Sequence, residues 1–145
     1  MISQTAEYAL RAVVHLASVS GEGGSGSQTT QQVADATRVP VGYLSKVLQG
    51  LSRAGVIASQ RGLGGGWTLS RAAQEISVFD VVQPVDPIRR IVACPLGLEA
   101  HNAALCPLHQ SLDEAAAMLE KAFRETSIAI LVADPKRHSA FCAPS

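Results

Sequence analysis

The side chains with the most chemical potential lie in the second half of the sequence. Cys94 and Cys106 bracket a short segment, His101 lies between them, and His109 falls three residues after Cys106. Thiolates and imidazoles are ligands for iron–sulfur clusters and for zinc. The same two thiols could instead oxidise to a disulfide or be buried without a chemical role. The segment is therefore a candidate sensor or metal site.

The expected compartment bears on these alternatives. We find no signal peptide and no membrane span, because the apolar run 9–17 is short and is interrupted by Arg11 and His15. A cytoplasmic protein is expected, and structural disulfides are rare there, which favours metal or redox chemistry over a structural bridge. We interpret Cys142, near the end of the chain, as a thiol without a role, and His15 as a packed histidine.

The residues from Val41 to Leu69 indicate what such a sensor would control. Leu44, Val47, Leu48 and Leu51 have the spacing of one apolar stripe on a helix. The opposite face of this predicted helix carries short or polar side chains that suit a DNA groove. We call it the recognition face: Gly42, Tyr43, Ser45, Lys46, Gln49 and Arg53.

The residues that follow predict a β-hairpin. Gly55 suits the left-handed position after a helix, residues 56–61 and 67–70 can form two strands, and the glycine-rich tip 62–66 follows Arg61. Such a tip is also typical of an ordinary loose hairpin. A phosphate-binding enzyme loop is disfavoured because no Lys-Ser/Thr follows the glycines. Helix, hairpin and basic tip together indicate a winged helix-turn-helix.

A second helix is predicted before the recognition helix. Thr29 can cap it while Gln32 reaches back, in the pattern of a capping box. The turn 38–40 ends in Pro40, which is expected at the entry to the recognition helix, where its missing N–H costs nothing. Charge agrees weakly with DNA binding: residues 1–71 hold six Lys/Arg against three acids, and the remainder holds six against nine.

The predicted DNA contacts have three parts. The start of the second helix and of the recognition helix should touch the backbone, while the recognition face reaches base edges or phosphates. The hairpin should lie in the minor groove or along phosphates. Besides the recognition face, the predicted residues are Thr29, Thr30, Ser59, Arg61, Gly64, Gly65 and Gly66. Each polar side chain alone could equally be part of a solvated surface.

Four further helical segments are expected. Residues 2–16 should form a first helix with Ala6, Leu10, Val13, Val14 and Ala17 on its buried side, and 18–28 a Gly/Ser-rich surface loop. Residues 77–85 suit a short helix capped by Ser77, and 127–132 a terminal helical turn. Residues 107–125 predict a long helix whose apolar seam could pack on its own domain or form a homodimer, which we favour. The seam is Leu108, Leu112, Ala115, Leu119, Ala122, Phe123 and Thr126.

The motif Leu-Ser-Lys-Val-Leu-Gln-x-Leu-x-x-Ala-Gly-x-Ile-x-Ser-x-Arg-Gly-x-x-Gly-Gly, read from Leu44 to Gly66, resembles the Rrf2 family of bacterial transcription regulators. That family includes the iron–sulfur cluster assembly regulator, the nitric-oxide-sensing repressor and the cysteine-metabolism repressor. The resemblance extends from Ile2 to about Val132. It implies a dimeric winged-helix regulator that binds a roughly palindromic operator in double-stranded DNA.

The resemblance also implies a ligand set. Cys94 and Cys106 match the outer two of three cysteines in cluster-binding members, but Ala100, beside His101, replaces the middle one. His109 matches the histidine of the cluster assembly regulator. Glu7 matches an acidic ligand that some members take from the other subunit, while Arg11 replaces a histidine used by a redox-sensing member.

Our hypothesis is therefore an iron–sulfur cluster held by Cys94 and Cys106, with His109 or His101, and with Glu7 of the partner subunit. A [2Fe–2S] cluster is favoured over [4Fe–4S]. The alternatives are a thiol switch without metal and inert cysteines.

The sequence divides into four predicted regions. Residues 1–86 form the winged helix-turn-helix, 87–106 the sensor loop, 107–132 the dimerisation and terminal helices, and 133–145 a flexible tail. The expected fold is mainly α with a small β-hairpin, and the expected function is a homodimeric repressor. Two other classes compete: a thiol oxidoreductase, disfavoured because no Cys-x-x-Cys is present, and an interaction module that does not bind DNA.

Overall fold

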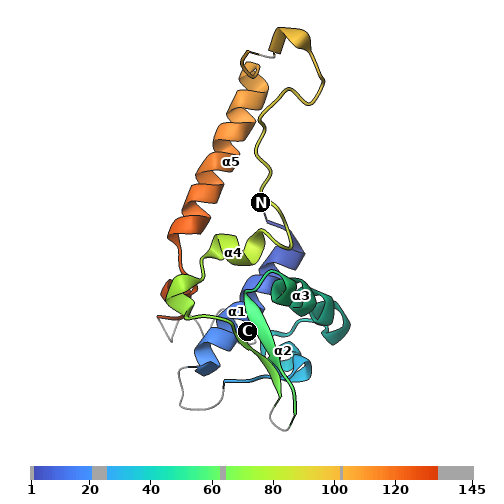
Figure 1. Cartoon of the computed structure of the whole chain (residues 1–145), viewed down its shortest axis with the longest axis vertical. Coiled ribbons are helices and arrows are strands. Elements are labelled where there is room, and N and C mark those ends of the chain that lie inside the picture. The colour runs from blue at the N-terminus through green and yellow to red at the C-terminus, as the bar shows by residue number, and fades with distance from the viewer. Residues whose placement is uncertain (1, 21–25, 63–64, 102, 134–145) are drawn as a thin grey trace.

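The structure is a helical body from which one long helix projects (Figure 1). It is a computed structural model that describes residues 2–20, 26–62, 65–101 and 103–133. The body contains α1 (Gln4–Ser20), α2 (Thr30–Thr37), α3 (Val41–Arg53), β1 (Ile57–Gln60), β2 (Gly66–Leu69), η1 (Ala73–Glu75), α4 (Val78–Val82) and α6 (Ile128–Val132). The arm consists of the segment 88–106, with η2 (Glu99–His101), and α5 (Pro107–Glu125). The predicted mainly helical fold with a small hairpin is confirmed.

Helix α1 is longer than predicted and lies at the centre of the body. It begins after Ser3, whose hydroxyl accepts a hydrogen bond from the Ala6 amide at 3.1 Å. It continues to Ser20, so the predicted end at Leu16 is wrong. Ser18 and Ser20 donate their hydroxyls to carbonyls of the preceding turn at 2.7 and 2.8 Å, which keeps them inside the helix although serines also favour loops.

The buried side of α1 is also broader than predicted. Ala6, Val13 and Val14 are buried as expected, but Leu10 and Ala17 are only half-buried. Ala9, Ala12 and Leu16 are fully buried instead. Helices α2, α3, α4 and α6 and strand β2 all pack on α1, so the helix is covered from more than one direction.

Helices α2 and α3 form the predicted helix-turn-helix. The capping box is confirmed: the Thr29 hydroxyl accepts the Gln32 amide at 3.1 Å, and the Gln32 side chain accepts the Thr29 amide at 2.8 Å. Arg38 turns the chain in the left-handed conformation at φ 58°. Pro40 directly precedes α3, at the predicted entry to the helix. The predicted apolar stripe of α3 is buried: Leu44, Val47, Leu48 and Leu51.

The wing is the antiparallel pair β1–β2 with its connecting turn. Ile57 pairs with Leu69 and Gln60 with Gly66. Strand β1 is shorter than predicted, because Val56 closes the end of α3 by donating to the Leu51 carbonyl at 3.0 Å. Strand β2 has the predicted length of four residues but begins and ends one residue earlier than predicted. Gly55 has φ 78°, as predicted for the residue after a helix.

Helix α4 connects the body to the base of the arm. Ser77 caps it as predicted, with Asp80 completing a capping box, but the helix ends at Val82, before Pro84. The Val78 amide donates to the Thr126 carbonyl at 2.8 Å, and the Ile128 amide donates to the Ile76 carbonyl at 2.8 Å. Two hydrogen bonds therefore join the start of α4 to the junction between α5 and α6.

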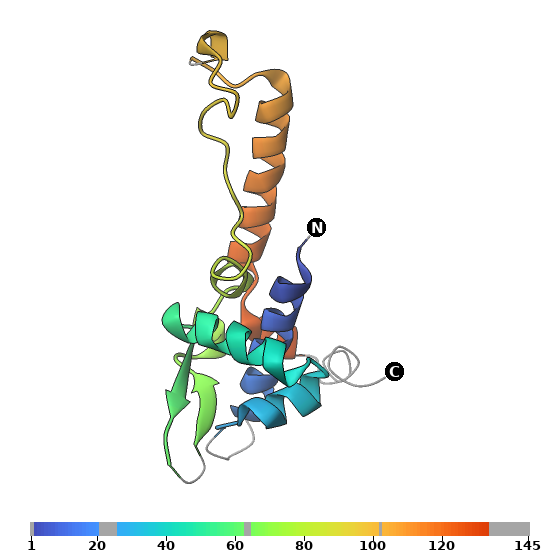
Figure 2. The same ribbon diagram turned by 90° about the vertical axis from the view of Figure 1, so that its right-hand side faces the viewer.

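The arm is built as predicted from Pro107 to Glu125, followed by the short helix α6 capped by Ser127. No residue of α5, whose whole length the structure describes, is buried. Both views show the arm tip and the wing at opposite ends of the molecule (Figures 1 and 2). The predicted tail 133–145 lies, apart from Ala133, outside the described residues, and so does Cys142. No helix in the described part of the chain is long and apolar enough to cross a membrane.

A bidentate ion pair fastens the segment 88–106 to α5. Arg90 donates from Nε and Nη2 to the two carboxylate oxygens of Asp113, each at 2.8 Å, and the Ile91 amide donates to Asp113 at 2.8 Å. The Arg90 and Ile91 hydrogen bonds lower the pKa of Asp113 from 3.8 to about 2.

The ion pair between Arg90 and Asp113 predicts that the segment 88–106 loosens from α5 at acid pH. Because the folded pKa is lowered, the contribution of Asp113 to stability is present above about pH 4 and is lost as the pH falls through about 2. We expect the amide of Ile91 to lose hydrogen-exchange protection in that range. Asp113→Asn should remove this pH dependence while α1–α3 stay unchanged; an identical acid profile in that variant would contradict the assignment.

Candidate nucleic-acid interface and the cysteine segment

The recognition face lies on the solvent side of α3. Ser45 is half-buried, and the other five members are exposed: Gly42, Tyr43, Lys46, Gln49 and Arg53. A Cβ added at Gly42 would meet no atom within 4 Å, so this position is open. On the wing, Ser59 and Arg61 are exposed and Gly65 and Gly66 are half-buried, while Gly64 lies outside the described residues. Most of the predicted DNA-contacting residues that the structure describes are therefore accessible to a ligand.

Tyr43 is held in place from α1. Its hydroxyl hydrogen-bonds the Thr5 hydroxyl, and its ring meets Tyr8 edge-to-face with the centroids 5.4 Å apart. The Arg11 guanidinium lies 5.7 Å from the centre of the Tyr8 ring. Sequence spacing did not reveal these contacts, because the partners are distant in the chain. They orient the one aromatic side chain of the recognition face.

Thr29 and Thr30, the residues predicted to contact DNA at the start of α2, can still donate hydrogen bonds from their hydroxyls. The Thr29 hydroxyl accepts from Gln32, and the Thr30 hydroxyl accepts from Trp67 Nε1 at 2.9 Å. A hydroxyl that accepts one hydrogen bond still has its own O–H to donate. The first amides of a helix also lack partners within the helix. This end of α2 can therefore donate to a phosphate.

The wing is joined to α2 through Trp67. The amide and carbonyl of Trp67 pair with those of Gln28 at 2.7 and 3.0 Å, beside the side-chain bond to Thr30. Gln28 in turn contacts His15 Nε2 at 3.2 Å, so His15 is a half-buried, hydrogen-bonded histidine. The wing and the helix-turn-helix are thus fixed to each other, a connection that the sequence did not reveal.

Cys94 and Cys106 belong to the segment 88–106 of the arm, and the arm projects away from the part of the body that holds α3 (Figure 1). Cys106 precedes α5, and its Sγ lies 3.2 Å from Nδ1 of His109, so these two predicted ligands do meet. Cys94 is half-buried. His101 ends η2, but its side chain lies outside the described residues. Glu7 is on α1 and pairs with Arg11 of its own chain at 2.7 Å.

The donors that the structure describes in one chain do not complete a metal site. Within residues 2–20, 26–62, 65–101 and 103–133, no three His, Cys, Asp or Glu side chains form a group that could hold a metal ion. A cluster would need donors beyond the Cys106–His109 pair, for example from a second subunit.

The family is decided by comparison with known proteins. The family model Rrf2, described as an iron-dependent transcriptional regulator, matches residues 2–134. The chain belongs to the Rrf2 family. A putative HTH-type transcriptional regulator of Rhodobacter capsulatus, described as rrf2-like, is 31% identical over 132 residues, which cover 91% of this chain and 85% of that protein. This Rrf2 protein is thus a transcriptional regulator and not an enzyme, and the thiol oxidoreductase alternative is dismissed.

Solved structures confirm the Rrf2 fold. IscR of T. potens has a TM-score of 0.75 and 20% identity, covering all of this chain and 93% of its own. The global cysteine regulator CymR of B. subtilis has a TM-score of 0.73 and 20% identity, covering 92% of this chain and 96% of its own. The predicted winged-helix architecture is therefore correct.

Proposed function

We propose that this Rrf2 protein is a cytoplasmic homodimer that binds a roughly palindromic operator in double-stranded DNA and represses transcription. The observation that carries the proposal is the polar, largely exposed face of α3 together with the exposed Arg61 of the wing. Tyr43, Ser45, Lys46 and Gln49 would reach base edges or phosphates. Thr29, Thr30 and the wing would contact the sugar-phosphate backbone of the DNA.

The apolar seam of α5 supports the homodimer. Leu108 is 63% exposed and Leu112 51% exposed, although their spacing places both on one stripe of the helix. A second copy of the arm is the partner that would cover this stripe in both subunits at once. A two-fold dimer then presents two copies of α3 to two DNA half-sites.

Lys46→Ala is expected to weaken DNA binding on all sequences alike. Its ammonium is exposed on the recognition face and would neutralise about one phosphate, so the slope of log affinity against log salt should fall by about one. Lys121→Ala, on the arm, is the matched control and should leave both affinity and slope unchanged. Equal affinity of Lys46→Ala and wild type would show that this face does not touch DNA.

We further propose that the thiols of Cys94 and Cys106 are the sensing groups. The two candidate sensing chemistries are an iron–sulfur cluster and a thiol switch without metal. The description of the family as iron-dependent and the likeness to IscR favour iron, whereas no group of three potential ligands forms among the described residues of one chain. A thiol switch needs only a peroxide: one thiolate takes an oxygen to become a sulfenic acid, and the second displaces hydroxide to form the disulfide.

Native mass spectrometry on protein purified without oxygen tests both chemistries. A dimer with the mass of two irons and two sulfides, lost in Cys94→Ala, supports the cluster. A bare dimer that loses the mass of two hydrogen atoms per chain on peroxide treatment, but not in Cys106→Ala, supports the switch. Wild type that carries no cluster mass and does not react with peroxide would refute sensing at these thiols.

A further inference from the structure

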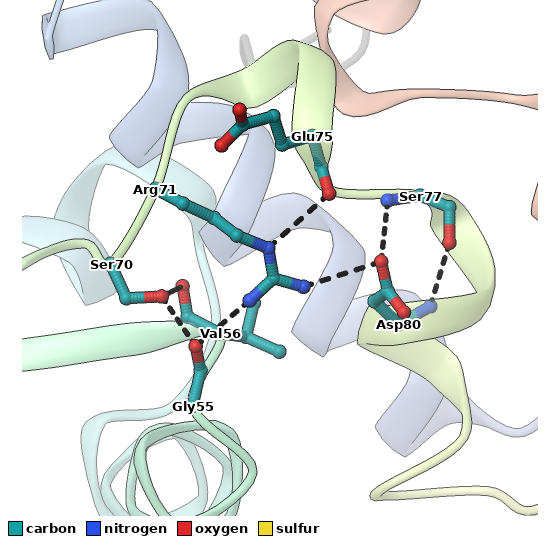
Figure 3. Close-up of polar contacts among 7 residues, drawn as sticks. All are labelled: Gly55, Val56, Ser70, Arg71, Glu75, Ser77 and Asp80. Atoms are coloured by element: carbon teal, nitrogen blue, oxygen red, sulfur yellow. Dashed lines mark hydrogen bonds and ion pairs between the residues drawn. The ribbon is translucent and has the colours of Figure 1, made fainter.

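Arg71 lies two residues after the end of β2, and its guanidinium bonds three separate segments (Figure 3). Nη1 donates to the Gly55 carbonyl at 3.1 Å, and Nε donates to the Glu75 carbonyl at 3.2 Å. Nη2 pairs with Asp80 Oδ2 at 3.4 Å. The planar guanidinium has donors in fixed directions, which lets one side chain serve three acceptors.

The first acceptor belongs to the end of the recognition helix. The Gly55 amide donates to the Ser52 carbonyl and the Val56 amide to the Leu51 carbonyl, each at 3.0 Å, which is a Schellman motif. The Gly55 carbonyl then points toward the base of the wing, where it accepts from both Arg71 and the Ser70 hydroxyl. Arg71 therefore contacts the position at which α3 ends.

The third acceptor belongs to α4. Asp80 Oδ2 accepts the Ser77 amide at 2.9 Å in the capping box of α4 and also pairs with Arg71 (Figure 3). The carboxylate therefore fixes the start of α4 and the guanidinium at the same time. A shift of α4 would therefore displace Arg71, and the hydrogen bond from Arg71 would carry that displacement to the Gly55 carbonyl.

Helix α4 is also attached to the arm. The guanidinium of Arg124, in the last turn of α5, lies 3.7 Å from the centre of the Phe79 ring. The Val78 amide donates to the Thr126 carbonyl at 2.8 Å. The contacts thus run without interruption from the base of α5 through α4 and Arg71 to the end of α3.

We propose that Arg71 is a positioning residue that holds α3 and the wing at a set angle to α4 and the arm. The inference rests on the proposed function, because in a dimer joined through the arms this angle sets the separation of the two recognition faces. Arg71 would then act on operator spacing without touching DNA.

Geometry, and not the strength of the ion pair, is the basis of this role. The side chains of Arg71 and Asp80 are 36% and 35% exposed, and such pairs add little to stability. Lysine would keep the charge but could not reach three acceptors from one planar group. Arg71→Lys should therefore behave like Arg71→Gln and not like wild type.

Hydrogen exchange on the full chain tests the connection itself. In Arg71→Gln and Asp80→Asn, amides of 52–56 and 77–83 should exchange about tenfold faster, the effect of losing one net hydrogen bond. Exchange in α1 and the thermal midpoint should change little. Arg89→Gln removes an exposed arginine of the arm and is the control. Unchanged exchange at 52–56 and 77–83 in both variants would overturn the proposal.

A selection of binding sites from random duplex DNA tests the consequence. Wild type should enrich paired half-sites at one spacing, and Arg71→Lys should enrich the same half-sites at several spacings. A single wild-type spacing in Arg71→Lys would overturn the positioning role. If wild type enriches no sequence, DNA binding fails as the function, and the exchange experiment alone decides whether Arg71 joins the two units.

Discussion

Leu112→Glu is expected to convert the proposed homodimer into a monomer and to weaken binding to the proposed operator by about a hundredfold or more, because two linked half-site contacts become independent. Leu112 is half exposed in the middle of the apolar seam of α5. A carboxylate buried there against a second copy of the seam would lose its hydration without gaining a partner. Sedimentation velocity reports the subunit number, and a DNA titration reports the affinity.

Lys121→Glu is the control for this substitution. It introduces the same side chain on the same helix, at an exposed position outside the seam. That variant should remain dimeric and keep wild-type affinity apart from a small salt-dependent change. If Leu112→Glu remains dimeric at micromolar concentration, α5 does not form the interface, and another surface must join the subunits.

Gly66→Ala is expected to separate the wing from α2 and to lower the free energy of unfolding by about 2–3 kcal/mol. Gly66 has φ 153°, and a Cβ there would contact the Gln28 carbonyl and lie 2.9 Å from the Thr29 nitrogen. The obstacle is backbone, which cannot rotate away. The paired hydrogen bonds between Gln28 and Trp67 must therefore lengthen or break.

Fluorescence can follow this separation, because Trp67 is the one tryptophan of the chain and lies in the contact. Its emission should shift to longer wavelength in Gly66→Ala, and the urea midpoint should fall. Gly42→Ala is the matched control, since a Cβ there meets nothing within 4 Å and alanine favours the helix. Wild-type emission and urea midpoint in Gly66→Ala would show that the wing is not held by this contact.

Local signals in the sequence predicted much of the fold. The capping residues Thr29 and Ser77 and the apolar stripe of α3 act within one or two helical turns, so their spacing alone identifies them. The bounds of α1 were missed because Ser18 and Ser20 stay in the helix through hydrogen bonds to their own backbone. Serine, which also favours loops, does not by itself indicate this outcome.

The sequence predicted which residues belong to the candidate site, but not the tertiary contacts that hold them in place. The recognition face follows from helical periodicity, which explains why all but one of its members are exposed. The contacts of Tyr43 with Tyr8, of Trp67 with Gln28 and of Arg71 with Asp80 depend on tertiary packing. Cys106 and His109 are three residues apart at the start of α5, so the local helix geometry accounts for the contact observed between these two proposed ligands.

Titration of the wild-type protein with random duplex DNA at low and high salt tests the central claim most directly. The recognition face and the wing should neutralise several phosphates, so log affinity should fall linearly with log salt, by about 0.9 for each phosphate contacted. Lys46→Ala should reduce that slope by about one. The absence of binding at low salt, or an affinity that does not change with salt, would contradict DNA recognition by this face.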